Sequence, residues 1–298
     1  MKRAVLLLAH GAPRNLEEVD EYVLHIRHGR PLEPHLMATI KDRYRQVGGS
    51  PLLHWTHRQA EELQKRMERE LPAAGNVYMG MRHSHPFIKE TIDQMSTQQI
   101  ESFIAVCLAP QFSRLTIGAY QKALDEAIAA SGSAMQYSFL TTYARHPKLI
   151  HAFAAQLKDA LNLHPQAFII FTAHSLPERV LAEADPYDYE TKKTACLVAQ
   201  AVGVKDWRFA YQSQGMTSEK WLGPTVEARI DEISALQRNE IIVAPIGFVC
   251  DHVEILYDID VAFKGYAKAR GIDLYRTASL NDSHEFVDLL FDLIRERV

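Results

Sequence analysis

The sequence predicts an α/β protein in which parallel strands alternate with helices that cover both faces of the sheet. The 298-residue chain contains short apolar runs, separated by segments whose apolar residues recur with helical spacing. Such alternation is typical of parallel sheets. With 47% hydrophobic residues the chain can bury a sizeable core, and its length suits two domains. The expected strands cover residues 3–9, 76–81, 102–108, 136–141, 167–172, 207–211 and 240–245.

A long crossover follows the first strand. Residues 10–75 contain two or three segments with helical spacing and no strand-like run. An insertion of this kind often forms one wall of a binding site, because it leaves the sheet at the carboxyl end of the strand.

The later helices begin at recognisable residues. Proline is tolerated in the first turn of a helix, since the N–H that it lacks would have no partner there. The expected helices are 86–97 from Pro86, a stretch after Thr116 to about 130, 147–161 from Pro147, and 224–237 from Pro224.

The strand–loop–helix pattern restarts around residues 140–147, and we place a domain boundary there. The prediction is an N-terminal domain of residues 1–140 and a C-terminal domain of residues 141–279 that carries the metal-site residues. A last helix within residues 280–298 follows Asn281-Asp282-Ser283, which are good capping residues. We expect this helix to pack back on the first domain.

The composition excludes several function classes. The net charge is −4, the pI is near 6.4, and no long basic block occurs, which argues against a general nucleic-acid binder. No stretch approaches the roughly 20 apolar residues of a spanning helix, and we expect a soluble, cytoplasmic monomer. The three cysteines, Cys107, Cys196 and Cys250, form no CxxC pair, so neither a disulfide framework nor a zinc ribbon is supported.

Two apolar runs end in side chains that can bind a metal. Residues 168–172 lead into Ala-His-Ser-Leu-Pro, which contains His174, and residues 241–244 lead into a segment that contains Glu254. Ligands bind at the carboxyl ends of strands in open parallel sheets. An imidazole and a carboxylate in one cleft suit a divalent first-row metal. The alternative for a lone histidine is a strand-end residue that bonds only to backbone.

The segment from Asp251 to Asp260 is rich in acids. A helix starting at Asp251 would put Glu254 and Asp258 on one face, with His252 in the first turn. A solvated helix start favoured by the helix dipole would look similar. The apolar residues 246–249 favour burial, however, and a buried carboxylate requires a partner. A row of acids could also pass a hydrated cation inward, which makes Asp258 a candidate relay residue.

Other motifs allow more than one interpretation. His83 and His85 lie at another strand end, where they could bind a metal, point apart, or cap the helix at Pro86. The glycines of Gly-Gly-Ser-Pro-Leu at 48–52 allow close backbone approach to a ligand but do not form a phosphate loop. No GxGxxG follows the first strand, so a nucleotide cofactor is not expected. The basic residues Arg27, His28, Arg30, Arg43 and Arg45 form either a solvated face or a carboxylate-binding surface.

Taken in order, these motifs resemble those of the ferrochelatases, which insert ferrous iron into a porphyrin to make haem. The resemblance runs through nearly the whole chain. The strings that carry it are Gly-Gly-Ser-Pro-Leu at 48–52, Gly-Met-Arg and His-Pro-Phe within 80–87, Pro-Gln-Phe-Ser at 110–113 with Thr116, Ala-His-Ser-Leu-Pro at 173–177, Asp-Pro-Tyr at 185–187, Tyr-Gln-Ser-Gln at 211–214, Trp-Leu at 221–222, and Pro-Ile-Gly-Phe-Val-Cys-Asp-His-Val-Glu at 245–254.

The resemblance implies two similar Rossmann-like domains, each a parallel sheet with helices on both faces, and an active-site cleft between them. It implies that His174 and Glu254 hold the incoming iron and help to remove the pyrrole protons. It also implies that the porphyrin is bound bent out of plane, which uses strain for catalysis. Ferrous iron is then a substrate and no tightly bound cofactor is expected. An iron–sulfur cluster is not expected either, because no cysteine-bearing extension precedes the end at Val298.

The stretches 25–34 and 41–44 resemble the branch that uses coproporphyrin III, whose four propionates call for arginines around the cleft. His10 stands where that branch usually has a tyrosine facing the iron, and Ala262 replaces a third acid beyond Asp258. His85 resembles the protoporphyrin branch instead. The alternatives are therefore a protoporphyrin IX ferrochelatase, a non-catalytic haem or porphyrin carrier, and a cobalt or nickel chelatase. The positions that match porphyrin contacts are His10, Arg27, Arg43, Tyr44, Ser50 and Tyr120.

Overall fold

The computed structural model describes residues 2–215 and 217–298, and the chain divides into two compact units. Unit 1 comprises Met1–Ala109, Arg114–Thr142 and Asn281–Val298. Unit 2 comprises Pro110–Ser113 and Tyr143–Leu280. The chain thus passes into unit 2 near residue 142, and its last helix belongs to unit 1.

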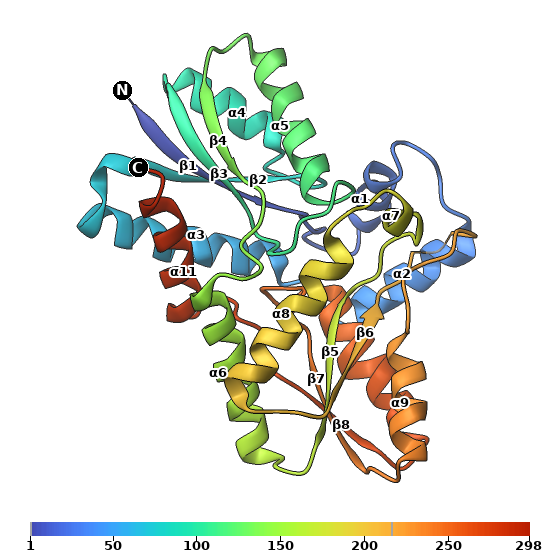
Figure 1. The fold of residues 1–298 in the computed structure, drawn as a ribbon. Helices are drawn as coiled ribbons and strands as arrows, with labels where there is room; N and C mark the ends of the chain where they lie inside the picture. Colours follow the sequence, from blue (N-terminus) through green and yellow to red (C-terminus); the bar gives the residue numbers. More distant parts are fainter. Residues whose placement is uncertain (1, 216) are drawn as a thin grey trace. The chain divides into compact units, whose positions relative to one another are not determined.

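Unit 1 is built on a parallel four-stranded sheet with the order β2-β1-β3-β4. The middle strands are almost entirely buried, because each carries a continuous apolar run. Helices α3 and α11 pack together on one side of the strands and α4 and α5 on the other (Figure 1). The strands are β1 (Arg3–Ala9), β2 (Asn76–Met81), β3 (Ser102–Cys107) and β4 (Gln136–Leu140), and these helices are α3 (Leu52–Glu70), α4 (Ile88–Thr97), α5 (Ile117–Ser131) and α11 (His284–Arg295).

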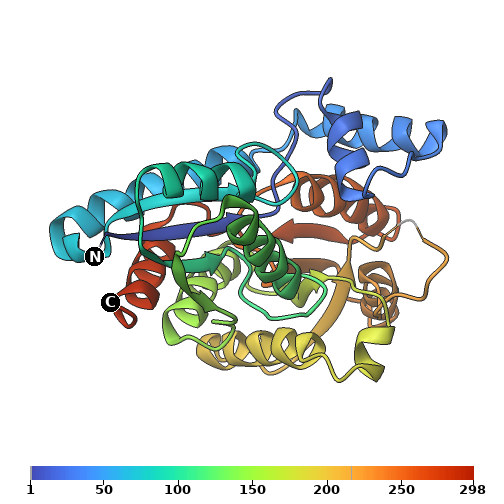
Figure 2. The same cartoon turned by 90° about the horizontal axis from the view of Figure 1, so that it is seen from above.

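The two ends of the chain meet in unit 1. Arg3 donates a hydrogen bond of 3.1 Å from Nη1 to the carbonyl oxygen of Val298. Figure 2 shows both ends of the chain at the edge where the strands of this sheet begin. The hydroxyl of Ser283 accepts the N–H of Phe286 and so caps α11 where the sequence predicts a cap.

Unit 2 repeats this topology with a parallel sheet in the order β6-β5-β7-β8. Helices α6 and α8 pack on one side of β5, and α9 lies on the other (Figure 1). The strands are β5 (Phe168–His174), β6 (Trp207–Gln212), β7 (Glu240–Ala244) and β8 (Asp273–Arg276), and the helices are α6 (Pro147–Leu163), α7 (Arg179–Ala182), α8 (Tyr187–Val202), α9 (Val226–Ala235) and α10 (Lys264–Lys268). Two parallel sheets with helices therefore confirm the predicted fold class.

The crossover between β1 and β2 contains three helices and a short 3-10 turn at Pro72–Ala74. The first two helices are α1 (Val19–Ile26) and α2 (Pro34–Val47). Among the described residues, no helix combines the length and the hydropathy that crossing a bilayer requires.

Two helices begin later than their prolines predict. The Glu90 carboxylate accepts the N–H of Phe87, so α4 starts at Ile88 and not at Pro86. The Thr225 hydroxyl accepts the N–H of Ala228, so α9 starts at Val226 and not at Pro224. In both cases a side-chain cap, and not the proline, sets the first residue of the helix.

The predicted helix from Asp251 is wrong in its start and its type. Asp251 accepts hydrogen bonds from Arg276 and Ser279, at 3.0 and 2.7 Å, and these contacts hold it before the helix. The segment Ile255–Phe263 is a π-helix, a rare form that is frequent at functional sites. Its apolar side chains pack into the core of unit 2 against β5, β7 and β8. This packing fixes the wide helix on which the acids lie.

Candidate active site

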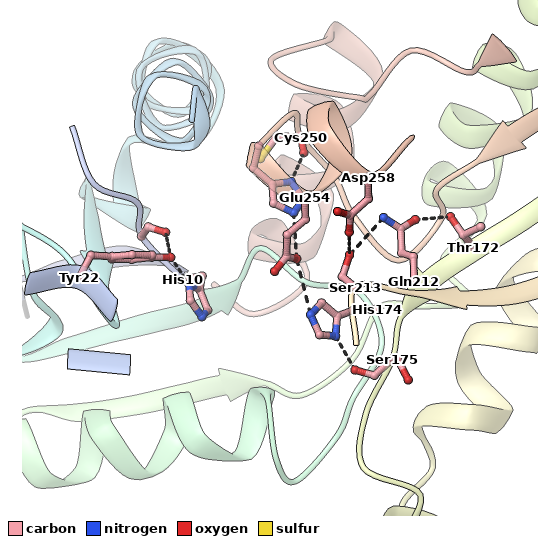
Figure 3. A network of polar contacts seen from close by, with 12 residues as sticks. His10, Tyr22, Thr172, His174, Ser175, Gln212, Ser213, Cys250, Glu254 and Asp258 are labelled. Atoms are coloured by element: carbon pink, nitrogen blue, oxygen red, sulfur yellow. Dashed lines mark hydrogen bonds and ion pairs between the residues drawn. The ribbon is translucent and has the colours of Figure 1, made fainter. Parts of the chain in front are cut away.

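The ends of β5 and β7 bring an imidazole and a carboxylate together within unit 2. His174 is the last residue of β5, and Glu254 lies directly before the π-helix that follows β7. These two strands are neighbours in the sheet. Figure 3 shows the two side chains pointing toward each other, with 3.6 Å between His174 Nε2 and Glu254 Oε2. The two residues that the sequence singles out thus form one pair.

The backbone fixes which nitrogen of His174 faces the carboxylate. His174 Nδ1 is hydrogen bonded to the carbonyl oxygen of Ser175. A carbonyl oxygen can only accept, so Nδ1 carries the hydrogen and Nε2 is turned toward Glu254. The sequence left open the alternative that this histidine bonds only to backbone. His174 does make a backbone hydrogen bond, but that bond also turns the ring toward a second contact with Glu254.

A second imidazole, which sequence reasoning left unassigned, faces the same oxygen. His252 Nδ1 donates to the carbonyl oxygen of Cys250 at 3.0 Å, and its Nε2 lies 3.5 Å from Glu254 Oε2. Two Nε2 atoms therefore converge on one carboxylate oxygen. Lone pairs on all three atoms repel each other, so a proton or a cation between them is stabilised.

The electrostatics of the pair follow from this geometry. Burial alone would lower the pKa of His174, but the charge of Glu254, its hydrogen bond and the Ser175 carbonyl outweigh burial and raise it. Burial alone would raise the pKa of Glu254, but His174 and His252 lower it well below its ordinary value. Both side chains remain partly exposed, at 31% for His174 and 39% for Glu254, so a ligand can reach them.

Asp258 lies deeper and is held by a chain of polar side chains. Its Oδ2 accepts a hydrogen bond of 2.5 Å from the Ser213 hydroxyl (Figure 3). Gln212 donates to the same hydroxyl at 3.4 Å and accepts from Thr172 at 2.7 Å. Asp258 is buried, and its charge helps to raise the pKa of His174. The network connects the acid on the π-helix to both β5 and β6.

The backbone after β5 is held from several directions. The Tyr187 hydroxyl donates to the carbonyl oxygen of His174 at 2.9 Å. The Ser175 N–H donates to Gln212 O at 2.7 Å, and its hydroxyl donates to Leu222 O at 2.8 Å. Sequence reasoning assigned no role to Tyr187, Gln212 or Ser213, although all three lie in strings that carry the family resemblance.

In unit 1 the end of β1 carries His10 in a defined orientation. The Tyr22 hydroxyl donates to Gly11 O at 3.0 Å and lies 2.9 Å from His10 Nδ1. Since the hydroxyl has one hydrogen, it accepts from His10 Nδ1 (Figure 3). The ring of His10 also lies against that of His83, with 4.6 Å between centroids.

His83 and His85 point to different partners, which is one of the alternatives that the sequence left open. His83 is buried, and its Nδ1 lies 3.0 Å from His25 Nδ1. Burial and the positive charges of His10 and Arg82 lower the pKa of His83 to about 2. His85 is exposed and pairs with Glu90 at 2.8 Å.

The remaining predicted porphyrin contacts are spread over the helices of unit 1. Arg27 ends α1 and donates to the carbonyl oxygens of Arg30 and Pro31. Tyr120 is buried on α5, where burial raises its pKa well above the ordinary value. Arg43 and the buried Tyr44 lie on α2, and the partly buried Ser50 lies between α2 and α3. Within residues 2–215 and 217–298, no group of three or more His, Cys, Asp or Glu side chains is arranged to hold a metal ion.

Comparison with known proteins gives one consistent family. The ferrochelatase family model matches residues 2–298. A ferrochelatase from Herpetosiphon aurantiacus is 40% identical over 295 residues, which are 97% of each chain. A coproporphyrin III ferrochelatase from Geobacillus sp. is 32% identical over 305 residues, covering 100% of this chain and 98% of the relative.

Solved structures agree at the level of the fold. The structure of SirB from Bacillus subtilis with Fe3+ has a TM-score of 0.63 and 12% sequence identity to this chain. The match covers 99% of this chain and 95% of the SirB chain. CbiX, described as the terminal enzyme of sirohaem biosynthesis in denitrifying bacteria, has a TM-score of 0.58 and 12% identity, with coverage of 99% and 100%. With a family model that spans the described sheets and the His174–Glu254 pair, this chain belongs to the ferrochelatase family.

Proposed function

We propose that this ferrochelatase inserts ferrous iron into coproporphyrin III. In this proposal the His174–Glu254 pair binds the incoming metal and accepts the displaced pyrrole protons. The single observation that carries the proposal is the convergence of His174 Nε2 and His252 Nε2 on Glu254 Oε2, at 3.6 and 3.5 Å. Such a site stabilises positive charge, and the reaction delivers it first as Fe2+ and then as the displaced pyrrole protons.

Proton transfer follows from the electrostatics of the pair. Metallation of a neutral porphyrin releases two protons, so a base must accept them next to the macrocycle. Neutral His174 accepts a proton at Nε2, and Glu254 stabilises the imidazolium that forms. Because both side chains are partly exposed, the proton can then pass to water. Asp258, held by Ser213, adds negative charge behind the pair.

Positive charge in unit 1 supports coproporphyrin III as the substrate. Residues 25–45 contain five Arg or Lys and two Asp or Glu, in a chain whose net charge is −4. Coproporphyrin III carries four propionates and protoporphyrin IX carries two. Guanidinium groups bind carboxylates well because their planar shape allows paired hydrogen bonds. Relatives from Geobacillus sp. and Halalkalibacterium halodurans that bear the coproporphyrin name are 32% and 34% identical to this chain.

Anaerobic metallation rates with the two porphyrins test the substrate. We expect kcat/KM with coproporphyrin III to exceed that with protoporphyrin IX by at least about tenfold, which corresponds to ~1.4 kcal/mol. Arg27→Gln and Arg43→Gln should reduce this ratio by raising KM for coproporphyrin. Arg69→Gln, an exposed arginine of α3, is the matched control and should leave the ratio unchanged. A preference for protoporphyrin in the wild-type protein would overturn the substrate assignment.

We further propose that the protein works in the cytoplasm without a resident cofactor or an iron–sulfur cluster. Such clusters require several cysteine thiolates close together. Cys107 lies on β3, Cys196 on α8 and Cys250 in the segment after β7, and none of the three forms a disulfide. Burial raises the pKa of Cys107 and Cys250 to about 12, so both stay protonated. Stoichiometric iron and acid-labile sulfide in the purified protein would contradict this proposal.

A further inference from the structure

Gly247 makes an unusually close backbone contact with the strand that carries His174. It lies in the turn between β7 and the π-helix, and its N–H donates to Thr172 O at 3.2 Å. A Cβ atom at position 247 would lie 2.7 Å from Ala173 Cβ and 2.8 Å from Ala173 Cα. Carbon atoms at ordinary contact are about 3.5–4.0 Å apart. The backbone of Gly247 does not have a positive φ. Glycine is therefore required here by the lack of room for a Cβ atom and not by the backbone conformation.

Neither side of this contact is free to withdraw. Ala173 is fully buried and pairs in register with Tyr211 on β6. On the other side, the Gln111 amide donates to Ile246 O at 3.0 Å and holds the turn in place. The Tyr187 hydroxyl meanwhile holds the carbonyl of His174. An added methyl group at position 247 would therefore have to displace backbone and not a flexible side-chain end.

The contact joins the two segments that carry the reactive pair. Ala173 immediately precedes His174, and Gly247 lies in the segment that leads to Glu254. We propose that Gly247 is a positioning residue, whose missing side chain lets this turn lie against Ala173 and so sets the distance between His174 Nε2 and Glu254 Oε2. The inference rests on the proposed function in one respect, namely that this pair binds the incoming metal.

Small displacements at such a pair have large effects, because a catalytic group must lie within about 0.5 Å of its productive position. In Gly247→Ala we expect kcat for metallation to fall about 10- to 100-fold, while KM for the porphyrin changes less than about twofold. The dissociation constant for Co2+, measured in the absence of porphyrin by the visible absorption of the bound ion, should rise at least about tenfold, or ~1.4 kcal/mol.

Two further variants separate positioning from loss of structure. Gly265→Ala on α10 is the matched control, because nothing lies within 4 Å of the added methyl group there. It should leave kcat and Co2+ binding unchanged. Ala173→Gly, placed in the Gly247→Ala protein, removes the 2.7 Å contact and keeps the 2.8 Å contact, so it should restore both properties in part.

The outcomes distinguish this inference from the proposed function. Wild-type kcat and Co2+ affinity in Gly247→Ala would overturn the inference, as would a rise in KM alone or a failure of Ala173→Gly to restore any activity. If Gly247→Ala does not fold, Ala173→Ser enlarges the same contact from its other side and should weaken Co2+ binding; unchanged binding would refute the inference. If the wild-type protein metallates no porphyrin, the proposed function fails, while the Co2+ comparison still tests the positioning role.

Discussion

Units 1 and 2 have the same sheet topology but opposite chemistry where their strands end. Each is a parallel sheet in which the first strand lies between the second and the third, followed by the fourth at the edge. In unit 2 a carboxylate faces two imidazoles, and the pKa of His174 is raised. In unit 1 imidazoles face each other beside Arg82, and the pKa of His83 is lowered to about 2. The fold places histidines near the ends of strands in both units, and the neighbouring charges decide whether the pKa of each histidine is raised or lowered.

This difference explains why only one of the two histidine groups is a good base. His174 gains a proton readily because Glu254 offsets the charge, whereas protonated His83 would be buried among positive groups. Counting histidines along the chain cannot separate these cases. The predictions below follow from this contrast.

The largest effect is expected from His174→Ala, which removes the proposed base and metal ligand. Metallation should slow by about 10²–10⁴-fold, the usual range for loss of a general base. Porphyrin binding, measured by fluorescence quenching, should survive. His25→Ala removes an imidazole from unit 1 instead and should change kcat less than about threefold. Retained turnover in His174→Ala would refute the assignment of the base.

Glu254→Gln should slow metallation less and should also shift its pH dependence. In the wild-type protein a protonated His174 cannot bind metal or accept a proton, so kcat falls as the pH falls through its raised pKa. Without the carboxylate the pKa of His174 decreases, and the acid limb of the profile should therefore move to lower pH. The maximal rate should fall about 10- to 100-fold. An acid limb that stays in place would show that another group titrates.

Ser213→Ala tests the support behind the pair. Loss of the hydroxyl leaves the buried Asp258 without one donor, which should cost about 1–3 kcal/mol of unfolding free energy and reduce kcat a few-fold. Ser218→Ala, an exposed serine in the same loop, is the control. Urea denaturation and steady-state assays measure the two effects. Equal stability of the two variants would argue that the Ser213 contact has no role.

The smallest effect on activity is expected from substitution of His83. Its lowered pKa should instead affect the pH dependence of the free energy of unfolding. Its pKa is lower in the folded than in the unfolded protein, so the unfolded state gains a proton first as the pH falls below about 6.5. Stability should then decrease by up to about 1.4 kcal/mol per pH unit from this one group. His83→Leu should unfold with a flatter dependence between pH 5 and 7 than the wild-type protein. Parallel curves would contradict the lowered pKa.

Much of the fold could be predicted because the middle strands are continuous apolar runs. The sequence does not reveal strand β8, because Asp273–Arg276 has only four residues and a single buried side chain, Leu274. Apolar residues at every fourth position, such as Ile255 and Ile259, suit both an α-helix and a π-helix, so the sequence does not distinguish the two forms.

The central pair of the site could also be predicted, because His174 ends one buried strand and Glu254 lies in the segment that follows the neighbouring strand. The contacts around it could not. Ser213 and Asp258 are 45 positions apart in the sequence, and only the folded structure shows that their side chains are hydrogen bonded. The orientation of His252 depends on a hydrogen bond to Cys250 O, which no spacing rule predicts. The close approach of Gly247 to Ala173 is a tertiary contact as well, so the sequence alone does not predict it.

A crystal structure of the protein soaked in Co2+, with anomalous scattering recorded at the cobalt edge, would test the contrast between the two units most directly. The ion should bind in unit 2 between His174 Nε2 and Glu254 Oε2, where a carboxylate offsets its charge. A cobalt peak beside His25 and His83 in unit 1, with none at His174, would contradict the account.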